Sequence, residues 1–231
     1  MLALLLLGYA AGVSAHSAVE PVPREWKGFL ERVHLLNERA TKAGRGAQLL
    51  FVGDSITQGW EDAGKAAWEK HYASRGALNI GVGGDGTQNV LWRLDQGNVD
   101  GIDPRLAVVM IGTNNVTAGN TVAQVVEGVT AVVAKLRQKL PRTRVLLVGI
   151  LPREENPGMV RGTVLQINQV LQQLEDGQSV FWLDAGSRFV ARDGTISREL
   201  MPDFLHLSPS GYALWAETME ERITALLAQP R

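Results

Sequence analysis

The sequence contains no cysteine in its 231 residues. This absence excludes disulfide frameworks, thiolate zinc sites and cysteine nucleophiles, so any covalent catalysis must use another side chain. There is no basic surplus either, because 23 Lys and Arg stand against 24 Asp and Glu. The chain therefore does not fit a protein that binds nucleic acid by neutralising phosphates. After residue 15 no apolar run is long enough to span a bilayer, so no membrane insertion of the mature chain is expected.

The first fifteen residues differ from the rest. Residues 2–7 form a continuous apolar run, and Val13-Ser14-Ala15 has small residues where signal peptidase needs them. No Lys or Arg precedes the run, so a buried N-terminal element or a mis-assigned start is the alternative. We expect residues 1–15 to be a signal peptide of a secreted or periplasmic protein, which would otherwise be cytoplasmic. Residues 16–231 are then expected to form a single domain.

Five short apolar runs follow residue 48. They are continuous rather than alternating, which is typical of strands buried on both faces of a parallel sheet. The predicted strands cover residues 49–52, 78–80, 106–111, 145–151 and 180–183.

Segments with apolar residues at a period near 3.6 alternate with these runs, as in amphipathic helices. They run through residues 26–36, 122–136, 160–174 and 212–226, with Pro141 ending the second and Pro209 starting the last. This alternation predicts an α/β fold with three layers, α/β/α, around a five-stranded parallel sheet. Active sites in such sheets lie outside the carboxyl ends of the strands, so the residues after each run are candidate site residues.

Gly53-Asp54-Ser55 follows the first run. A serine at a tight turn between a strand and a helix is exposed at the sheet edge, with a helix amino terminus behind it. This geometry suits a nucleophile. A serine that only caps the helix has the same sequence pattern, and for the motif in isolation the cap is the commoner reading.

Glycine-rich residues 81–87 follow the second run, and Gly112-Thr113-Asn114-Asn115 follows the third. Glycines let backbone amides approach an oxyanion or a phosphate closely. The Asn114 amide can donate to developing negative charge, although asparagines in turns often only hold their own loop. Residues 83–87 also resemble the signature of diacylglycerol and NAD kinases. No Lys or Arg that could hold a phosphate follows closely, so a hydrolase is favoured over a kinase.

Asp203 and His206 lie just before the last predicted helix. Their spacing puts both on one side of a turn, so Asp203 can accept a hydrogen bond from one ring nitrogen while the other faces outward. Such a pair is structural at least as often as catalytic. The other three histidines lie beside the cleavage site, along the first helical stripe and at the expected opposite end of the sheet: His16, His34 and His71. His206 is therefore the candidate base.

In chain order, Gly53-Asp54-Ser55, Gly84, Asn114 and Asp203-Phe204-Leu205-His206 resemble the SGNH hydrolases, also called GDSL-type esterases. Residues 51–55, 79–85, 90–94 and 149–153 are similar to the catalytic subunits of platelet-activating-factor acetylhydrolase and their bacterial relatives.

The resemblance implies a flavodoxin-like sheet with Ser55 as nucleophile, His206 as base and Asp203 orienting the ring. It also implies an oxyanion held by the Ser55 and Gly84 amides and the Asn114 side chain. The choice of Gly84 over its neighbour comes from the resemblance alone.

These assignments predict hydrolysis of a carboxylic ester through an acyl-enzyme, with no metal or organic cofactor. Ile56, Thr113 and Leu205 neighbour the oxyanion site in sequence, and their bulk predicts a shallow pocket for acetyl and other short acyl chains. The alcohol could belong to a phospholipid, a carbohydrate or an aryl ester. Three tryptophans could stack on a sugar but are expected to be core residues: Trp60, Trp68 and Trp92. A homodimer is common in the acetylhydrolase branch.

Two rival functions come from other classes. A metal-dependent phosphoesterase would use Asp54, Asp85, Asp203 and His206 as hard ligands, but this splits a pair that already suits a dyad. A catalytically silent ligand-binding module on the same fold is the other rival, although every catalytic position is filled here.

Overall fold

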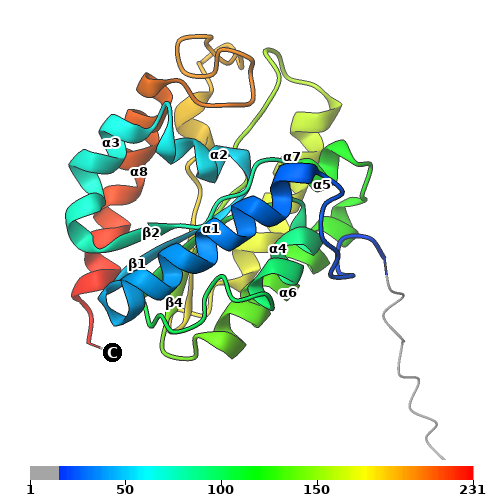
Figure 1. The fold of residues 1–231 in the computed structure, drawn as a ribbon. Coiled ribbons are helices and arrows are strands. Elements are labelled where there is room, and N and C mark those ends of the chain that lie inside the picture. The colour runs from blue at the N-terminus through cyan, green and yellow to red at the C-terminus, as the bar shows by residue number, and fades with distance from the viewer. Residues whose placement is uncertain (1–15, 231) are drawn as a thin grey trace, which may run out of the picture.

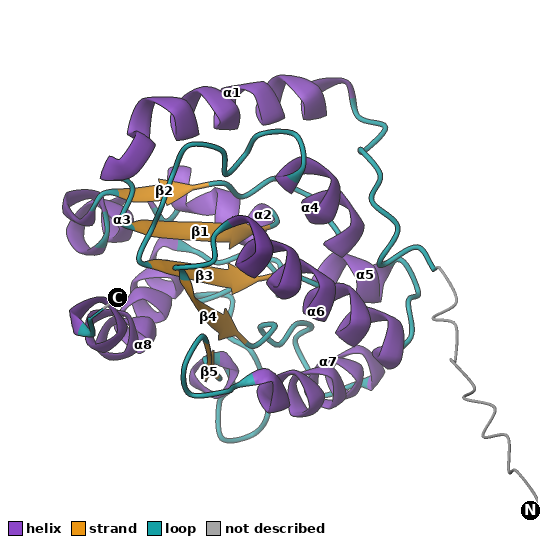
Figure 2. Ribbon diagram, turned by 90° about the horizontal axis from the view of Figure 1, so that it is seen from below, coloured by secondary structure: helices purple, strands orange, loops and turns teal. Residues whose placement is uncertain are grey.

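A computed structural model describes residues 16–230 of the chain, and the expected signal peptide lies outside the described residues. Five parallel strands form one sheet, with helices around it (Figure 1). The strands lie in the order β2-β1-β3-β4-β5 (Figure 2). They are β1 (Leu49–Gly53), β2 (Ala77–Asn79), β3 (Leu106–Met110), β4 (Arg144–Val148) and β5 (Val180–Leu183). The α/β class and the five-stranded parallel sheet predicted from the sequence are confirmed.

Three of the predicted strands extend past the paired residues at their carboxyl ends. The residues beyond the strand ends are Ile80, Ile111, Gly149, Ile150 and Leu151, all of which are nevertheless buried. A continuous apolar run reports burial rather than pairing, so the pattern includes the first residues of the loops that turn toward the site.

Helices cover both faces of the sheet (Figure 2). One face carries α1 (Lys27–Ala43), α4 (Thr87–Leu94), α6 (Val122–Lys139) and α7 (Met159–Leu171), and the other carries α3 (Lys65–His71) and α8 (Pro209–Ala228). Two short helices, α2 (Ser55–Gln58) and α5 (Thr113–Thr117), follow β1 and β3 closely. Single 3-10 turns occur at Gly44–Gly46, Gly59–Glu61, Ala73–Arg75, Gln172–Leu174 and Gly186–Phe189. Among residues 16–230, none of the helices has the length and apolar character needed to cross a bilayer.

Local signals set the ends of the long helices. Thr121 and Gln124 form a capping box at the start of α6, in which each side chain accepts from the other's backbone N–H. Ser208 caps α8, and Pro209 occupies its first position, where no N–H is needed.

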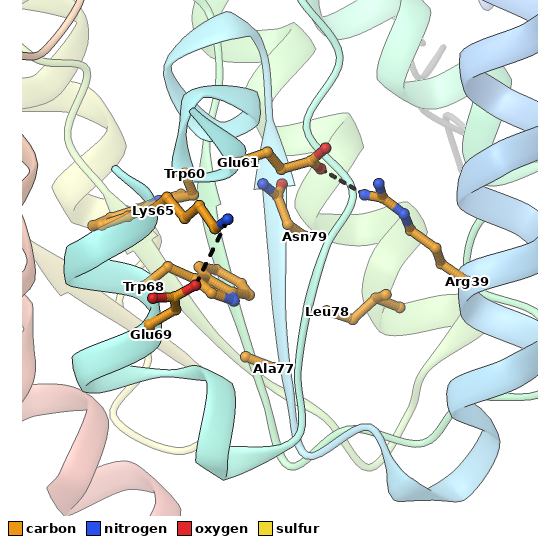
Figure 3. A pocket seen from close by; sticks show the side chains of 9 residues that line it. All are labelled: Arg39, Trp60, Glu61, Lys65, Trp68, Glu69, Ala77, Leu78 and Asn79. Carbon is orange, nitrogen blue, oxygen red and sulfur yellow. Dashed lines mark hydrogen bonds and ion pairs between the residues drawn. The ribbon is translucent and has the colours of Figure 1, made fainter. Parts of the chain in front are cut away.

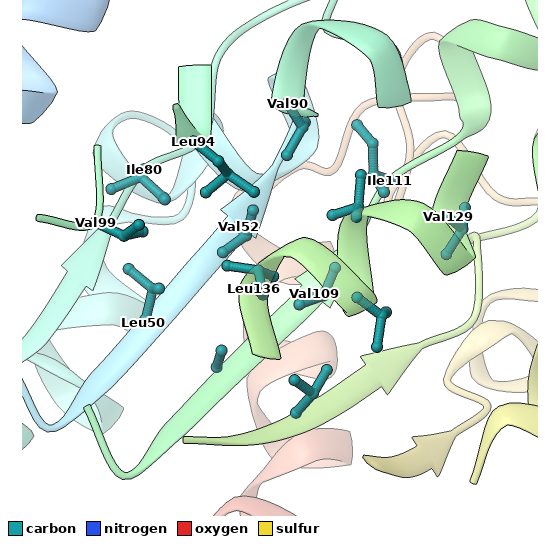
Figure 4. Packing of buried hydrophobic residues seen from close by; sticks show 14 of the residues in the cluster. Leu50, Val52, Ile80, Val90, Leu94, Val99, Val109, Ile111, Val129 and Leu136 are labelled. Carbon is teal, nitrogen blue, oxygen red and sulfur yellow. The ribbon is translucent and has the colours of Figure 1, made fainter. Parts of the chain in front are cut away.

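The sheet separates two hydrophobic clusters, because alternate residues of a strand point to opposite faces. Leu50 and Val52 face α4 and α6 in the first cluster (Figure 4). Phe51 faces the second, where Trp60 and Trp215 stack with ring centroids 5.1 Å apart.

The order of the strands fixes where a ligand can bind. The chain passes from β1 to β2 on one side and then crosses to β3 on the other side of β1. This reversal is the point at which open α/β sheets bind ligands, outside the carboxyl ends of the strands. Here it lies where α2 and α5 begin.

Candidate active site

Ser55 is the first residue of α2, directly beyond the end of β1. The cap of this helix is Asp54, whose carboxylate accepts from the Ile56 amide at 3.0 Å. Because Asp54 fills the capping position, the Ser55 hydroxyl is left to bond elsewhere. The alternative in which this serine only caps a helix is therefore not what the structure shows.

A chain of hydrogen bonds runs from this hydroxyl to a carboxylate. Ser55 Oγ lies 2.9 Å from His206 Nε2, and His206 Nδ1 lies 2.7 Å from Asp203 Oδ2, although 151 residues separate the serine from the histidine. The other carboxylate oxygen accepts from the amides of Leu205, at 3.1 Å, and His206, at 2.7 Å. Phe204 takes a left-handed conformation, with φ 59°, to close this turn. In this arrangement an imidazole can take the proton of the hydroxyl.

The charge on Asp203 sets the tautomer of the ring. Partial burial acts to raise its pKa, but hydrogen bonds from the His206 ring and the two amides outweigh this and hold the pKa below its ordinary value. An ionised Asp203 favours a proton on Nδ1, so Nε2 is left as the acceptor for the Ser55 hydroxyl.

The glycine-rich loop lies beside the serine. A Cβ added to Gly83 would lie 3.8 Å from the Ser55 Cβ. The Gly83 amide donates to Gln58 Oε1 at 2.7 Å, so it is already committed. The next amide belongs to Gly84, whose φ is 77°. Because the Gly83 amide already donates to Gln58, Gly84 is the better choice of oxyanion donor.

Asn114 approaches the same loop from α5. Its Nδ2 donates to the Asp85 carbonyl at 2.9 Å, which uses one of the two N–H groups of the amide. The structure thus brings Ser55, Gly84, Asn114, Asp203 and His206 to one edge of the sheet, as the sequence predicts. Their catalytic roles remain predictions.

A buried ionic network connects two of the elements that carry the site. Arg93 is fully buried and donates to Asp85 Oδ2 at 2.7 Å, to the Gly53 carbonyl at 3.0 Å and to Asn98 Oδ1 at 3.1 Å. It therefore ties the end of β1 to the glycine-rich loop. Sequence reasoning missed this role, because nothing in the spacing of Asp85 and Arg93 says that either is buried.

Two carboxyl groups in this region are shifted by their burial. Burial raises the pKa of Asp54 to about 7, and nearby Asp85 contributes in the same direction. Burial also raises the pKa of Asp85 to about 6, against the lowering effect of the Arg93 guanidinium.

The three residues expected to wall the acyl pocket come from separate elements. Ile56 is 2% exposed and belongs to the hydrophobic cluster beneath α2, and Thr113 is 3% exposed. Leu205 is partly buried against the same cluster as Ile56. Two of the three are thus immobilised by packing, and their part in acyl binding remains a prediction.

The hard ligands of the rival phosphoesterase hypothesis have other partners or lie buried. Asp85 is paired with Arg93, Asp203 is bonded to His206, and Asp54 caps α2. Within residues 16–230, no three or more His, Asp or Glu side chains are grouped so that they could hold a metal ion.

Two cavities lie apart from the serine. One, of about 270 Å³, lies along the edge strand β2, where charged side chains surround Trp60 and Trp68 (Figure 3). Another of about 200 Å³ lies between α7 and the loops after β4 and β5. Neither is lined by Ser55, Asp203 or His206. Trp60 is 1% exposed, whereas Trp68 and Trp92 are partly buried against the two core clusters.

Comparison with known proteins places this chain among the carboxylic ester hydrolases. Residues 51–214 match the model of the GDSL-like lipase/acylhydrolase family. The chain belongs to this family, which confirms the resemblance read from the sequence.

Relatives and structural neighbours agree with the family. Subunit alpha1 of human platelet-activating factor acetylhydrolase IB is 39% identical over 183 residues, covering 79% of this chain and 78% of that protein. The bovine alpha2 subunit is 38% identical over 182 residues, 78% of each. A GDSL-like lipase from Bacteroides thetaiotaomicron has a similar fold, with a TM-score of 0.67 at 16% identity, over 84% of this chain and 98% of that one. A catalytic mutant of an acetylxylan esterase from Geobacillus stearothermophilus gives 0.60 at 17%, over 81% and 99%.

Proposed function

We propose that this protein is a serine esterase that removes short acyl groups, acetyl above all, from a small-molecule or carbohydrate ester. The observation that carries the proposal is the 2.9 Å contact between Ser55 Oγ and His206 Nε2, with Asp203 bonded behind the ring. The names of the human relative and of the acetylxylan esterase support acetyl as the acyl group.

The proposed reaction has two halves. His206 takes the Ser55 proton as the oxygen attacks the ester carbonyl, and the resulting oxyanion is held by the Ser55 and Gly84 amides and the Asn114 side chain. The protonated ring then gives its proton to the departing alcohol, which leaves an acyl-enzyme. Water, deprotonated by His206, releases the acid and restores the serine.

The test compares hydrolysis of p-nitrophenyl acetate by the wild type and by Ser55→Ala. We expect kcat to fall by about 10³-fold or more, because no other group supplies the acyl-enzyme. Ser74→Ala, an exposed serine at the opposite end of the sheet, is the matched control and should keep the wild-type rate. Circular dichroism verifies that both variants fold. A Ser55→Ala protein with the full rate would place the nucleophile elsewhere.

Acyl length provides a separate test. Packing fixes Ile56 and Thr113 in place, and the proposal gives them the role of walls of a short acyl pocket. We expect kcat/KM to fall steeply from p-nitrophenyl acetate to the octanoate. Equal values for the two esters would contradict the short-acyl preference but would not contradict the role of Ser55 as nucleophile.

We also propose that residues 1–15 are removed on export, that residues 16–231 form one domain and that the protein is a homodimer. The intact mass of protein recovered from outside the cells shows whether cleavage falls after Ala15. Light scattering during gel filtration gives the oligomeric state.

A further inference from the structure

The segment before α1 ends at the edge of the active site. Residues 16–26 run beside α4 and α6 before the first helix begins (Figures 1 and 2). The Ala18 carbonyl accepts from Thr87 Oγ1 at 2.6 Å, and the Val22 carbonyl accepts from Asn89 Nδ2 at 3.0 Å. These contacts fasten the segment to the start of α4, next to the glycine-rich loop.

The fastened segment places Arg24 on that loop. Its Nη1 donates to the Gly83 carbonyl, and its Cζ lies 2.6 Å from the point where a Cβ of Gly84 would stand. The guanidinium thus occupies space that only glycine leaves open, beside the proposed oxyanion donor. Gly83 in turn is the residue whose Cβ would contact Ser55.

A second arginine contacts α5. Arg153, in the loop after β4, donates to Thr117 Oγ1 at 2.7 Å and to Thr113 Oγ1 at 3.3 Å. Both threonines belong to α5, the helix that carries Asn114. The two guanidinium groups therefore lie on the two elements that contribute the oxyanion donors besides the serine amide.

Both guanidinium groups donate to neutral oxygens in the structure. Arg24 and Arg153 are half-buried, yet within residues 16–230 no carboxylate lies at ion-pair distance from either. The charge of Arg24 acts to lower the pKa of Asp85, but the ion-pair partner of Asp85 is Arg93. Buried charges are normally paired, so two partly buried cations that bond only to neutral oxygens are suited to an anion brought in from outside.

We propose that Arg24 and Arg153 bind a negatively charged group on the substrate, so that the enzyme prefers esters with an anionic substituent near the scissile bond. This rests on the proposed function of Ser55. The guanidinium fork pairs with a carboxylate or a phosphate through two parallel hydrogen bonds, which makes either a suitable substituent.

The test measures binding apart from turnover. Calorimetry on the Ser55→Ala protein compares 4-acetamidobenzoate with the neutral 4-acetamidobenzamide, both amide analogues of an acetyl ester. We expect the anion to bind about 10-fold more tightly or better, since hydrogen bonds between charged groups exceed those to neutral ones by this order. A third ligand, 4-acetamidophenyl phosphate, shows which anion is preferred.

Charge-removing variants decide which arginine acts. Arg24→Gln and Arg153→Gln, made in the Ser55→Ala protein, should each lose most of the preference for the anion, and Arg24→Lys should keep part of it. Arg45→Gln, an exposed arginine at the amino end of β1, is the control and should change nothing. Equal affinities for the anion and the amide in the Ser55→Ala protein would overturn the proposal. So would equal losses for both ligands in Arg24→Gln and Arg24→Lys, which indicate a purely structural role. If the serine mechanism is wrong, a different result shows it: the Ser55→Ala protein would hydrolyse p-nitrophenyl acetate at the wild-type rate.

Discussion

Asp203 shows how one side chain serves two tasks. One oxygen holds the His206 ring, and the other accepts two backbone amides that shape the turn. A substitution that keeps the shape but removes the charge separates these tasks.

We expect Asp203→Asn to lower kcat for p-nitrophenyl acetate by about 10²-fold to 10⁴-fold while KM changes little. The amide oxygen can still accept from the backbone, but the ring loses the charge that stabilises its protonated form. Asp193→Asn, in an exposed turn that also bonds a backbone amide, is the matched control. A loss of equal size in both variants would contradict the assignment.

Asp54 makes stability depend on pH. Its pKa in the folded protein, about 7, lies above the value of 3.8 for a free carboxyl. The folded state therefore binds more protons than the unfolded state between these values, and this group's contribution to the free energy of unfolding falls as pH rises from about 4 to 7. Above pH 7 the contribution is constant.

Asp54→Asn removes this titration and keeps an oxygen to cap α2. We expect the variant to gain stability relative to the wild type as pH rises from 5 to 8, measured by urea unfolding at each pH. A difference between the two proteins that does not change with pH would show that Asp54 is ionised throughout.

At the scale of elements, α8 supports the helix that carries the serine. The Tyr212 hydroxyl, which is buried, donates to the Ile56 carbonyl at 2.7 Å. We expect Tyr212→Phe to cost about 1–3 kcal/mol in urea unfolding, because the buried carbonyl loses its partner. The Tyr72 hydroxyl is buried without a hydrogen-bond partner among the described residues, so Tyr72→Phe should cost nothing and serves as the control. Equal costs would show that the Tyr212 bond is unimportant.

The sequence predicts elements better than their contacts. Apolar periodicity locates the strands, and the residues just beyond them include Ser55 and Asn114, because parallel strands end at one edge. It does not reveal Arg24, which precedes Ser55 by a whole helix and strand and reaches the glycine-rich loop only through the path of residues 16–26. The sequence places no Lys or Arg just after that loop, which argues against an anion site there, but the fold brings the Arg24 guanidinium to the loop.

At the scale of the whole molecule, one sheet is shared by two cores. Each strand contributes alternate residues to the cluster under α6 and to the cluster under α8. If one cluster unfolds, the strands lose their packing on that face, and the other cluster is destabilised as well. We expect one unfolding transition, with the same urea midpoint by circular dichroism and by tryptophan fluorescence. Two separate midpoints would contradict a single domain.

The outer strands of the sheet are its shortest, with three residues in β2 and four in β5. An outer strand leaves a row of backbone groups unpaired, and through such rows chains add to one another and grow into fibrils. Beside β2 this row is short, and Arg39, Lys65 and Glu69 line the adjoining hollow (Figure 3). A foreign strand finds little to pair with there and must displace charged groups to reach it, so we expect the molecule to resist aggregation along this edge.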